Sequence, residues 1–221
     1  MRPIIIVNFK TAKSAIGKRA LKLAKICDGI AKKTKTKILV AVQIADIYRV
    51  VQSVKIGVLA EHVDFEKPDS HTGMILPEDI KENGAMGSLL NHSEHRLKID
   101  VLKKTIERCK KIKLKTIVCV ASVEEAKKIA KFKPDYLAFE IPSLIGTLRS
   151  VSKMRPREVK KFVEVVRKIN SKIVPLCGAG VANGEDVRVA LELGTKGILV
   201  ASAVNKAKNP RKVLLDLVNF K

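Results

Sequence analysis

Tyr136-Leu-Ala-Phe-Glu140-Ile-Pro-Ser-Leu-Ile-Gly-Thr147 is a short apolar run that ends on a carboxylate and continues into a loop containing a proline and a glycine. The run predicts a buried strand. Such a strand has no local reason to end on an acid, because desolvating an unpaired carboxylate is costly. At the C-terminal end of a parallel strand, however, an acid faces the crevice where α/β proteins place their chemistry. Glu140 is therefore a candidate site residue, and the alternative is an acid that simply meets solvent.

Seven other apolar runs alternate with amphipathic, helix-like stretches along the chain. They lie at 3–8, 37–42, 57–61, 87–91, 115–120, 173–178 and 197–201. Nearly continuous apolar strands separated by helices indicate a parallel sheet that is covered on both faces. Eight such units favour closure into an α/β barrel of the (β/α)8 type, with a doubly wound open sheet as the alternative. No linker or low-complexity segment interrupts the pattern, so we predict a single domain over residues 1–221.

The helices are expected between these strands, at positions marked by apolar periodicity and by proline and glycine. A proline in the first turn and a glycine beyond the last turn are the typical asymmetry of a helix, as at Pro77 and Gly84. The expected helices lie around 21–27, over 47–54, from 77 to before 84, over 99–112, 123–131, 156–169 and 184–194, and from about 210.

The formal net charge of +22 favours polyanions as partners at first sight. The lysines and arginines, however, recur along every helical segment instead of gathering in one stretch. The chain has only six phenylalanines, two tyrosines and no tryptophan, too few for a stacking platform for single-stranded nucleic acid. We therefore favour a solvated basic exterior over a nucleic-acid site.

The cysteines and the hydropathy indicate the cellular compartment of the protein. Cys27, Cys109, Cys119 and Cys177 are scattered, without a C-x-x-C pair, which fits buried reduced thiols better than zinc ligands or disulfides. No run of eighteen apolar residues is present, so no membrane span is predicted. A cytoplasmic protein that does not associate with membranes is expected.

Polar and small residues follow several of the predicted strands, where a barrel places its active site. Asn8 and Lys10 follow the first strand, His92 the fourth and Glu140 the sixth. Small-residue loops after the last two strands suit a phosphate, because their backbone amides are accessible next to helix N-termini. These loops are Gly178-Ala-Gly180 and Ala201-Ser202. Each signal is weak alone, since a lysine after a strand is usually a surface residue and a lone histidine is usually structural.

Taken together, the order and spacing of five motifs resemble the triosephosphate isomerase family. The motifs are Asn8-Phe-Lys10, Asn91-His-Ser-Glu94, Glu140-Ile-Pro142 with Ile145-Gly-Thr147, Cys177-Gly-Ala-Gly180, and Leu199-Val-Ala-Ser202. The segment Ser70-His-Thr-Gly73 and the short length resemble the archaeal branch of the family. The resemblance implies interconversion of dihydroxyacetone phosphate and D-glyceraldehyde 3-phosphate, in glycolysis and gluconeogenesis, with no metal and no organic cofactor.

The same resemblance implies roles for individual residues, and acid–base tuning in this family is a standard example in enzymology. Glu140 would be the base that takes the proton from carbon. His92, at the start of a short helical turn, would polarise the carbonyl as a neutral imidazole. Lys10 would stabilise the enediolate and attract the dianionic substrate, and Asn8 would orient that substrate. Glu94 would pair with Lys10 in a supporting shell that also includes Ser93. The phosphate would be held by Ile145, Gly146, Gly180, Ala201 and Ser202, and 141–147 would form a lid.

The sequence departs from the family pattern near the lid and the phosphate. Leu148 stands where a glycine usually follows Gly-Thr, and Arg149-Ser150 replaces a stretch that often carries proline. Ala203 replaces a common glycine near the phosphate, and His95 stands where an arginine or lysine is common. These departures bear on the rate more than on the reaction. The resemblance also implies a homotetramer, with a dimer as the alternative, in which a loop at about 63–74 contacts a neighbour. At +22 per chain, the subunits repel one another at low salt.

Two other functions remain open from the residues alone. Another phosphosugar isomerase would use an acid–base pair on strands one and five, but the fifth strand ends Cys119-Val-Ala-Ser122 without an acid. A barrel that binds RNA through its basic exterior would lose binding steeply with salt and would not depend on Glu140.

Overall fold

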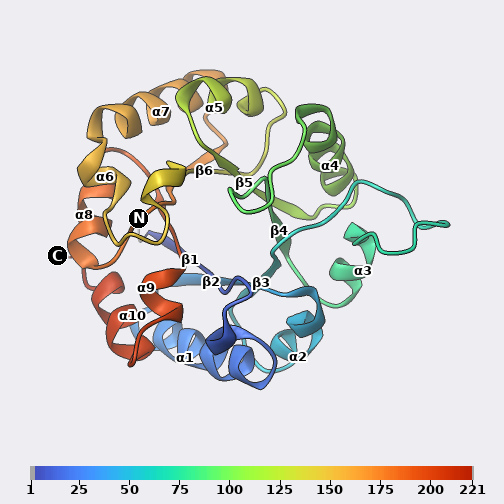
Figure 1. Cartoon of the computed structure of the whole chain (residues 1–221), viewed down its shortest axis with the longest axis horizontal. Helices are drawn as coiled ribbons and strands as arrows, with labels where there is room; N and C mark the ends of the chain where they lie inside the picture. The colour runs from blue at the N-terminus through green and yellow to red at the C-terminus, as the bar shows by residue number, and fades with distance from the viewer. Residues whose placement is uncertain (1–2, 221) are drawn as a thin grey trace.

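The computed structural model describes residues 3–220 and contains a closed barrel of eight parallel strands, with neighbours in sequence order. Figure 1 shows the barrel at the centre of a ring of helices. The closed (β/α)8 architecture predicted from the alternating pattern is confirmed, and the open sheet is excluded. Residues 1, 2 and 221 of the predicted domain lie outside the described part. The strands are β1 Ile4–Asn8, β2 Lys37–Val42, β3 Gly57–Ala60, β4 Gly87–Leu90, β5 Lys115–Val120, β6 Tyr136–Phe139, β7 Val174–Cys177 and β8 Gly197–Val200.

The helices cover the outside of the barrel. Four of them begin at residues whose type suits a helix start: Pro77, Pro156 and Pro210 occupy the first turn, and the Ser122 hydroxyl accepts a hydrogen bond from the Glu125 amide at 3.0 Å. The helices are α1 Lys18–Thr34, α2 Ile47–Val51, α3 Pro77–Glu82, α4 Ile99–Lys111, α5 Val123–Ala130, α6 Val151–Met154, α7 Pro156–Ile169, α8 Gly184–Glu192, α9 Ser202–Asn205 and α10 Pro210–Val218.

The sequence pattern did not predict α6 and α9, nor the 3-10 turns at Lys13–Ala15, Ile44–Asp46 and Pro142–Leu144. These elements have three or four residues, too few to display a helical repeat. They form in the loops that follow strands because tertiary contacts hold them. For example, the Val151 amide, in the first turn of α6, donates to the Ala179 carbonyl at 3.0 Å.

The strands are apolar on both faces because each face is buried against a different layer. Alternate residues such as Ile4, Ile6 and Leu39 fill the barrel, whereas Ile5 and Val7 pack outward under the helices. Side chains alternate with a period of two along a strand. The alternation therefore carries Asn8, two residues after Ile6, toward the inside of the barrel at its C-terminal end.

The same alternation of side chains brings residues from several strands together at the C-terminal end of the barrel. Glu140 follows the inward Ala138, and Gly178 follows the inward Leu176. Two further polar residues obey the rule, Gln43 after Ala41 and Glu61 after Leu59. The C-terminal mouth of the barrel is therefore lined by polar groups that the strand period selects. No helix within residues 3–220 is long and apolar enough to cross a membrane.

Candidate active site

The carboxylate of Glu140 is held in place by the strand that precedes it and by a glycine opposite. The backbone amide of Glu140 donates to the Val120 carbonyl at 2.8 Å, which extends the pairing between β6 and β5. A Cβ at Gly178 would lie 2.6 Å from Glu140 Cγ, so only a glycine leaves room for the acid. Glu140 is 3% exposed, and its Oε2 has no hydrogen-bond partner among the described residues.

Burial decides the protonation of this acid. Desolvation raises the pKa of Glu140 to about 8, although the neighbouring Cys119 thiol and the more distant Lys10 ammonium partly lower it. Burial also raises the pKa of Cys119, so that its thiol stays neutral beside the acid. A carboxylate with a raised pKa in a dry pocket is a stronger base than one in water.

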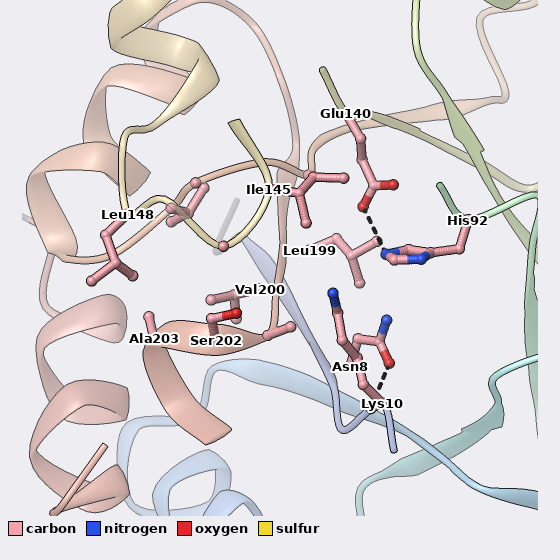
Figure 2. A pocket seen from close by; sticks show the side chains of 15 residues that line it. Asn8, Lys10, His92, Glu140, Ile145, Leu148, Leu199, Val200, Ser202 and Ala203 are labelled. Carbon is pink, nitrogen blue, oxygen red and sulfur yellow. Dashed lines mark hydrogen bonds and ion pairs between the residues drawn. The ribbon is translucent and has the colours of Figure 1, made fainter. Parts of the chain in front are cut away.

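His92 faces Glu140 from the loop after β4, with its Nε2 at 3.7 Å from Glu140 Oε1 (Figure 2). The backbone amide of Glu94 donates to His92 Nδ1 at 3.2 Å. Burial and the Lys10 charge lower the pKa of His92 to about 4. The ring is therefore neutral at pH 7, with its hydrogen on Nε2, which points into the pocket. His92 begins a single turn, in which the His95 amide donates to the His92 carbonyl at 2.8 Å.

Lys10 adopts a left-handed backbone conformation (φ 52°), which is uncommon for a residue with a side chain. Two contacts hold it. Its amide donates to Asn8 Oδ1 at 3.0 Å, and its ammonium pairs with Glu94 Oε1 at 2.7 Å, the pair that the family resemblance implies. The buried Asn205 of α9 donates to the carbonyls of Asn8 and Phe9, at 2.9 Å each. The rim of β1 is thus fixed by a residue almost two hundred positions away.

The segment after β6 approaches the segment after β8 on the far side of the pocket (Figure 2). A Cβ at Gly146 would lie 3.8 Å from the Ser202 hydroxyl. Gly180 has a φ of 70°, and a Cβ there would lie 1.9 Å from the Arg149 carbonyl oxygen. Only glycine at position 180 permits this approach of the lid segment. Leu148 lines the same pocket in a left-handed conformation (φ 59°).

Nine of the residues predicted from the sequence line one pocket: Asn8, Lys10, His92, Glu140, Ile145, Gly146, Gly180, Ala201 and Ser202. Glu94 reaches it through Lys10. Ser93 lies in the same turn but is not among the described residues that line the pocket. His95, one of the departures, is not among the described residues that line this pocket. Its ring packs against that of His62, with the centroids 4.3 Å apart and the ring planes tilted by 44°.

Sequence reasoning missed other residues that shape the site. Leu199 and Val200 line the pocket; they belong to one of the five motifs, but the sequence assigned them no role of their own. Asn205, Gln43 and Glu61 carry polar groups at buried or half-buried positions of the mouth. The period-two rule could have found Gln43 and Glu61, since each comes two residues after an inward-facing apolar residue.

The arrangement suits one kind of chemistry. A buried base faces a neutral hydrogen-bond donor across 3.7 Å, and Lys10 is the one cation among the described residues that line the pocket. These groups match proton removal next to a carbonyl in a small anionic molecule, with the donor and the cation stabilising the oxyanion that forms. Backbone amides and the Ser202 hydroxyl, at the start of α9, supply the neutral polar lining expected around a phosphate.

Comparison with known proteins agrees with this description. The family model described as triosephosphate isomerase matches residues 3–221. Three proteins named triosephosphate isomerase align over 98% of this chain. They are those of Methanobacterium bryantii (44% identical, 96% of its length), Methanocaldococcus jannaschii (43%, 99%) and Metallosphaera sedula (46%, 95%). Similarity of this extent, over nearly the whole length of this chain and of its relatives, shows that the chain belongs to the triosephosphate isomerase family.

Proposed function

We propose that Glu140, His92 and Lys10 together interconvert dihydroxyacetone phosphate and D-glyceraldehyde 3-phosphate in this pocket. The observation that carries the proposal is the 3.7 Å separation of Glu140 Oε1 and His92 Nε2, beside Lys10, in a pocket closed on its other side by small residues. A substrate carbon and its neighbouring oxygen, placed between these groups, would each meet the residue that its reaction needs.

The reaction then needs one base and no external reagent. Glu140 takes a proton from the hydroxymethyl carbon, and the electron pair of the broken C–H bond forms the carbon–carbon double bond of an enediolate. The former carbonyl oxygen takes up the negative charge and is stabilised by His92 Nε2–H and by the Lys10 ammonium. The hydroxyl proton on the first oxygen passes to the charged oxygen by way of His92, whose Nε2 gives its hydrogen to one oxygen and takes one from the other. Glu140 then returns its proton to the adjacent carbon, and the first carbon becomes the aldehyde. A base with a raised pKa and a neutral donor suit this sequence, because Glu140 gives back the proton that it took and His92 ends with its hydrogen on Nε2 as it began.

Phosphate binding on the opposite side is assigned to Gly146, Gly180, Ala201 and Ser202, with Ile145 covering them. Their support is their place in the pocket lining, together with the Ser202 hydroxyl at the start of α9. With 141–147 closed, water is excluded from the enediolate, which would otherwise expel its phosphate.

The decisive experiment is a coupled assay of the isomerase reaction with wild type and Glu140→Gln. We expect kcat to fall by about three orders of magnitude or more, because the amide cannot accept the proton. Glu107→Gln is the matched control, since it removes one acid from the exposed face of α4, where its partner is Lys103. Near-normal turnover in Glu140→Gln would remove Glu140 from the role of base.

We also propose a homotetramer, with a dimer as the alternative, in the cytoplasm. Support for assembly comes from the family resemblance and from the segment between β3 and α3, which projects from the barrel in Figure 1 and exposes 52% of Met74. Support for the cytoplasm comes from four free, buried cysteines. Sedimentation at about 0.01 M and about 1 M salt tests the assembly, because charge repulsion acts over roughly 30 Å in the first and 3 Å in the second. A monomer in both would reject it.

A further inference from the structure

A second cavity, of about 530 Å³, adjoins the active site on the side of β2 and β3. Asn8, Lys10 and His92 line both cavities. The second also contains Gln43 and Glu61, which play no part in the chemistry described above. An acid beside the pocket's cation, in an enzyme whose substrate is an anion, requires a physical explanation.

The position of Glu61 follows from the strands. Leu59 points into the barrel, so Glu61, two residues later, points toward the mouth. Gln43 reaches the same level from β2 and donates from Nε2 to Glu61 Oε2 at 2.5 Å. The other carboxylate oxygen, Oε1, is buried and has no hydrogen-bond partner among residues 3–220. The carboxylate is thus anchored on one side and unsatisfied on the other.

The charges around Glu61 make its ionised form costly. Burial raises the pKa of Glu61 to about 7, while the Gln43 amide, the Lys10 backbone amide and the Lys10 ammonium lower it and the Glu94 carboxylate raises it. The ammonium that could offset its charge is already paired with Glu94 at 2.7 Å. The remaining titratable groups that line the cavity are His62, His92 and His95, and His62 is bonded to Asp64 at 3.1 Å.

We propose that Glu61 is a positioning residue that tunes Lys10, and that the enzyme binds its phosphorylated substrate best when Glu61 is protonated. Neutral Glu61 leaves Lys10 one carboxylate partner and a larger share of its positive charge for the substrate. Ionised Glu61 adds a second negative charge on the side of Lys10 away from the substrate and repels the incoming dianion. The proposal rests on the role of Lys10 given above, and Lys10→Met tests that role separately because it leaves Glu61 in place.

The test is the pH dependence of one ratio, kcat/KM of Glu61→Gln divided by that of the wild type, between pH 5.5 and pH 9. This ratio cancels the titrations of Glu140 and of the substrate phosphate, which both enzymes share, and kcat/KM reports groups of the free enzyme. We expect a constant ratio at low pH and a rise of about three- to tenfold toward high pH, as expected for one charge removed at short range. The midpoint should lie near the pKa of about 7 given above for Glu61.

The glutamine keeps the shape of Glu61 and its bond to Gln43 but cannot ionise. A ratio that is flat across the pH range would overturn the proposal. If the ratio differs from one at low pH but still rises toward high pH, the proposal is supported. A structural defect would change the ratio equally at every pH, because it does not titrate. Glu107→Gln is the control: it removes the same charge from α4 outside both cavities, so its ratio should stay flat.

A second variant keeps the carboxylate and removes its donor. Gln43→Leu takes away the hydrogen bond that favours the ionised form, so the titration of Glu61 should move to higher pH. The pH at which kcat/KM falls because Glu61 ionises should therefore also be higher. This fall should be absent from the double variant Gln43→Leu with Glu61→Gln. A midpoint that does not move would count against Glu61 as the titrating group. Calorimetry adds a readout without catalysis, with glycerol 3-phosphate as an unreactive probe. At pH 7, the wild type should take up more protons when it binds this probe than Glu61→Gln does.

Discussion

The backbone amide of Glu94 donates to Nδ1 of His92 at 3.2 Å, and this contact fixes which nitrogen of the ring carries the hydrogen. Because an amide can only donate, Nδ1 must accept, and the neutral ring carries its hydrogen on Nε2. That nitrogen lies 3.7 Å from Glu140 Oε1. Glu94 therefore pairs with Lys10 through its side chain and orients His92 through its backbone. One short turn thus positions both groups that would stabilise the oxyanion, the Lys10 ammonium and the His92 ring.

The first prediction concerns the charge of His92. Burial and Lys10 lower its pKa to about 4, so the ring should remain neutral at every pH from 5 to 9. Nitrogen-15 NMR should show one Nε2–H tautomer with shifts independent of pH. A change of those shifts between pH 6 and pH 7 would contradict the assignment. Replacing the donor in His92→Gln should reduce kcat by about 10²- to 10³-fold, with a smaller effect on KM.

The second prediction concerns the glycine opposite the base. A Cβ in Gly178→Ala would lie 2.6 Å from Glu140 Cγ and must displace the carboxylate. We expect kcat to fall by about 10- to 100-fold, because a shift of about 1 Å in a catalytic group is costly. Gly29→Ala is the control, since no atom lies within 4 Å of its added methyl group and alanine suits the interior of α1. Equal kcat in the two variants would show that Glu140 tolerates the displacement.

The third prediction concerns the lid. Leu148 holds a φ of 59°, a conformation that costs a residue with a side chain about 1–2 kcal/mol relative to glycine. Leu148→Gly should relieve this strain where the lid lies against the pocket and should raise kcat by up to about fivefold. Lys113→Gly makes the same change at φ 60° after α4, away from the site, and should leave kcat unchanged. If kcat of Leu148→Gly is unchanged or lower, the leucine is no handicap to the hinge.

The fourth prediction links the base to stability. The pKa of Glu140 is about 8 in the folded protein, against about 4.3 in an unfolded chain, so the folded form binds more protons between these values. By linkage, its contribution to the stability of the wild type declines as pH rises from about 4.3 to about 8. Glu140→Gln has no such titration. Its Tm should exceed that of the wild type at pH 8, and the difference should shrink toward pH 5. A difference that is independent of pH would contradict the burial of an ionisable base.

Much of the fold could be predicted because it depends on local patterns. Every strand is a run of apolar residues, and most long helices carry both an apolar period and a proline or a cap at their start. Most ends of strands and helices lie within three residues of the prediction, as at α2, which ends at Val51 and not at Val54. The exception is α1, which continues seven residues beyond the predicted Cys27, to Thr34. The short helices α6 and α9 left no local signal and depend on contacts from distant loops.

The candidate site was predicted as a set of residues, but its geometry was not. The motifs pointed to Lys10, His92 and Glu140, yet nothing local told which nitrogen of His92 faces the pocket. The two residues before Lys10 are held by Asn205, which follows β8, and no pattern near either end of the chain predicts these hydrogen bonds. The period of two along the strands places Glu61 at the mouth, but its hydrogen bond to Gln43, which follows the neighbouring strand β2, is visible only in the structure.

The sequence by itself determined the order of the strands and helices and the kinds of side chain that end each strand, because these follow from hydrophobic period and residue type. The tertiary structure alone decided how those side chains act. Barrel closure brings Glu140, His92 and Lys10 to one mouth, and burial there makes Glu140 a stronger base and His92 a weaker one than in water. The physical reason is that desolvation and charge coupling depend on atoms that are adjacent in space, whichever positions they hold along the chain.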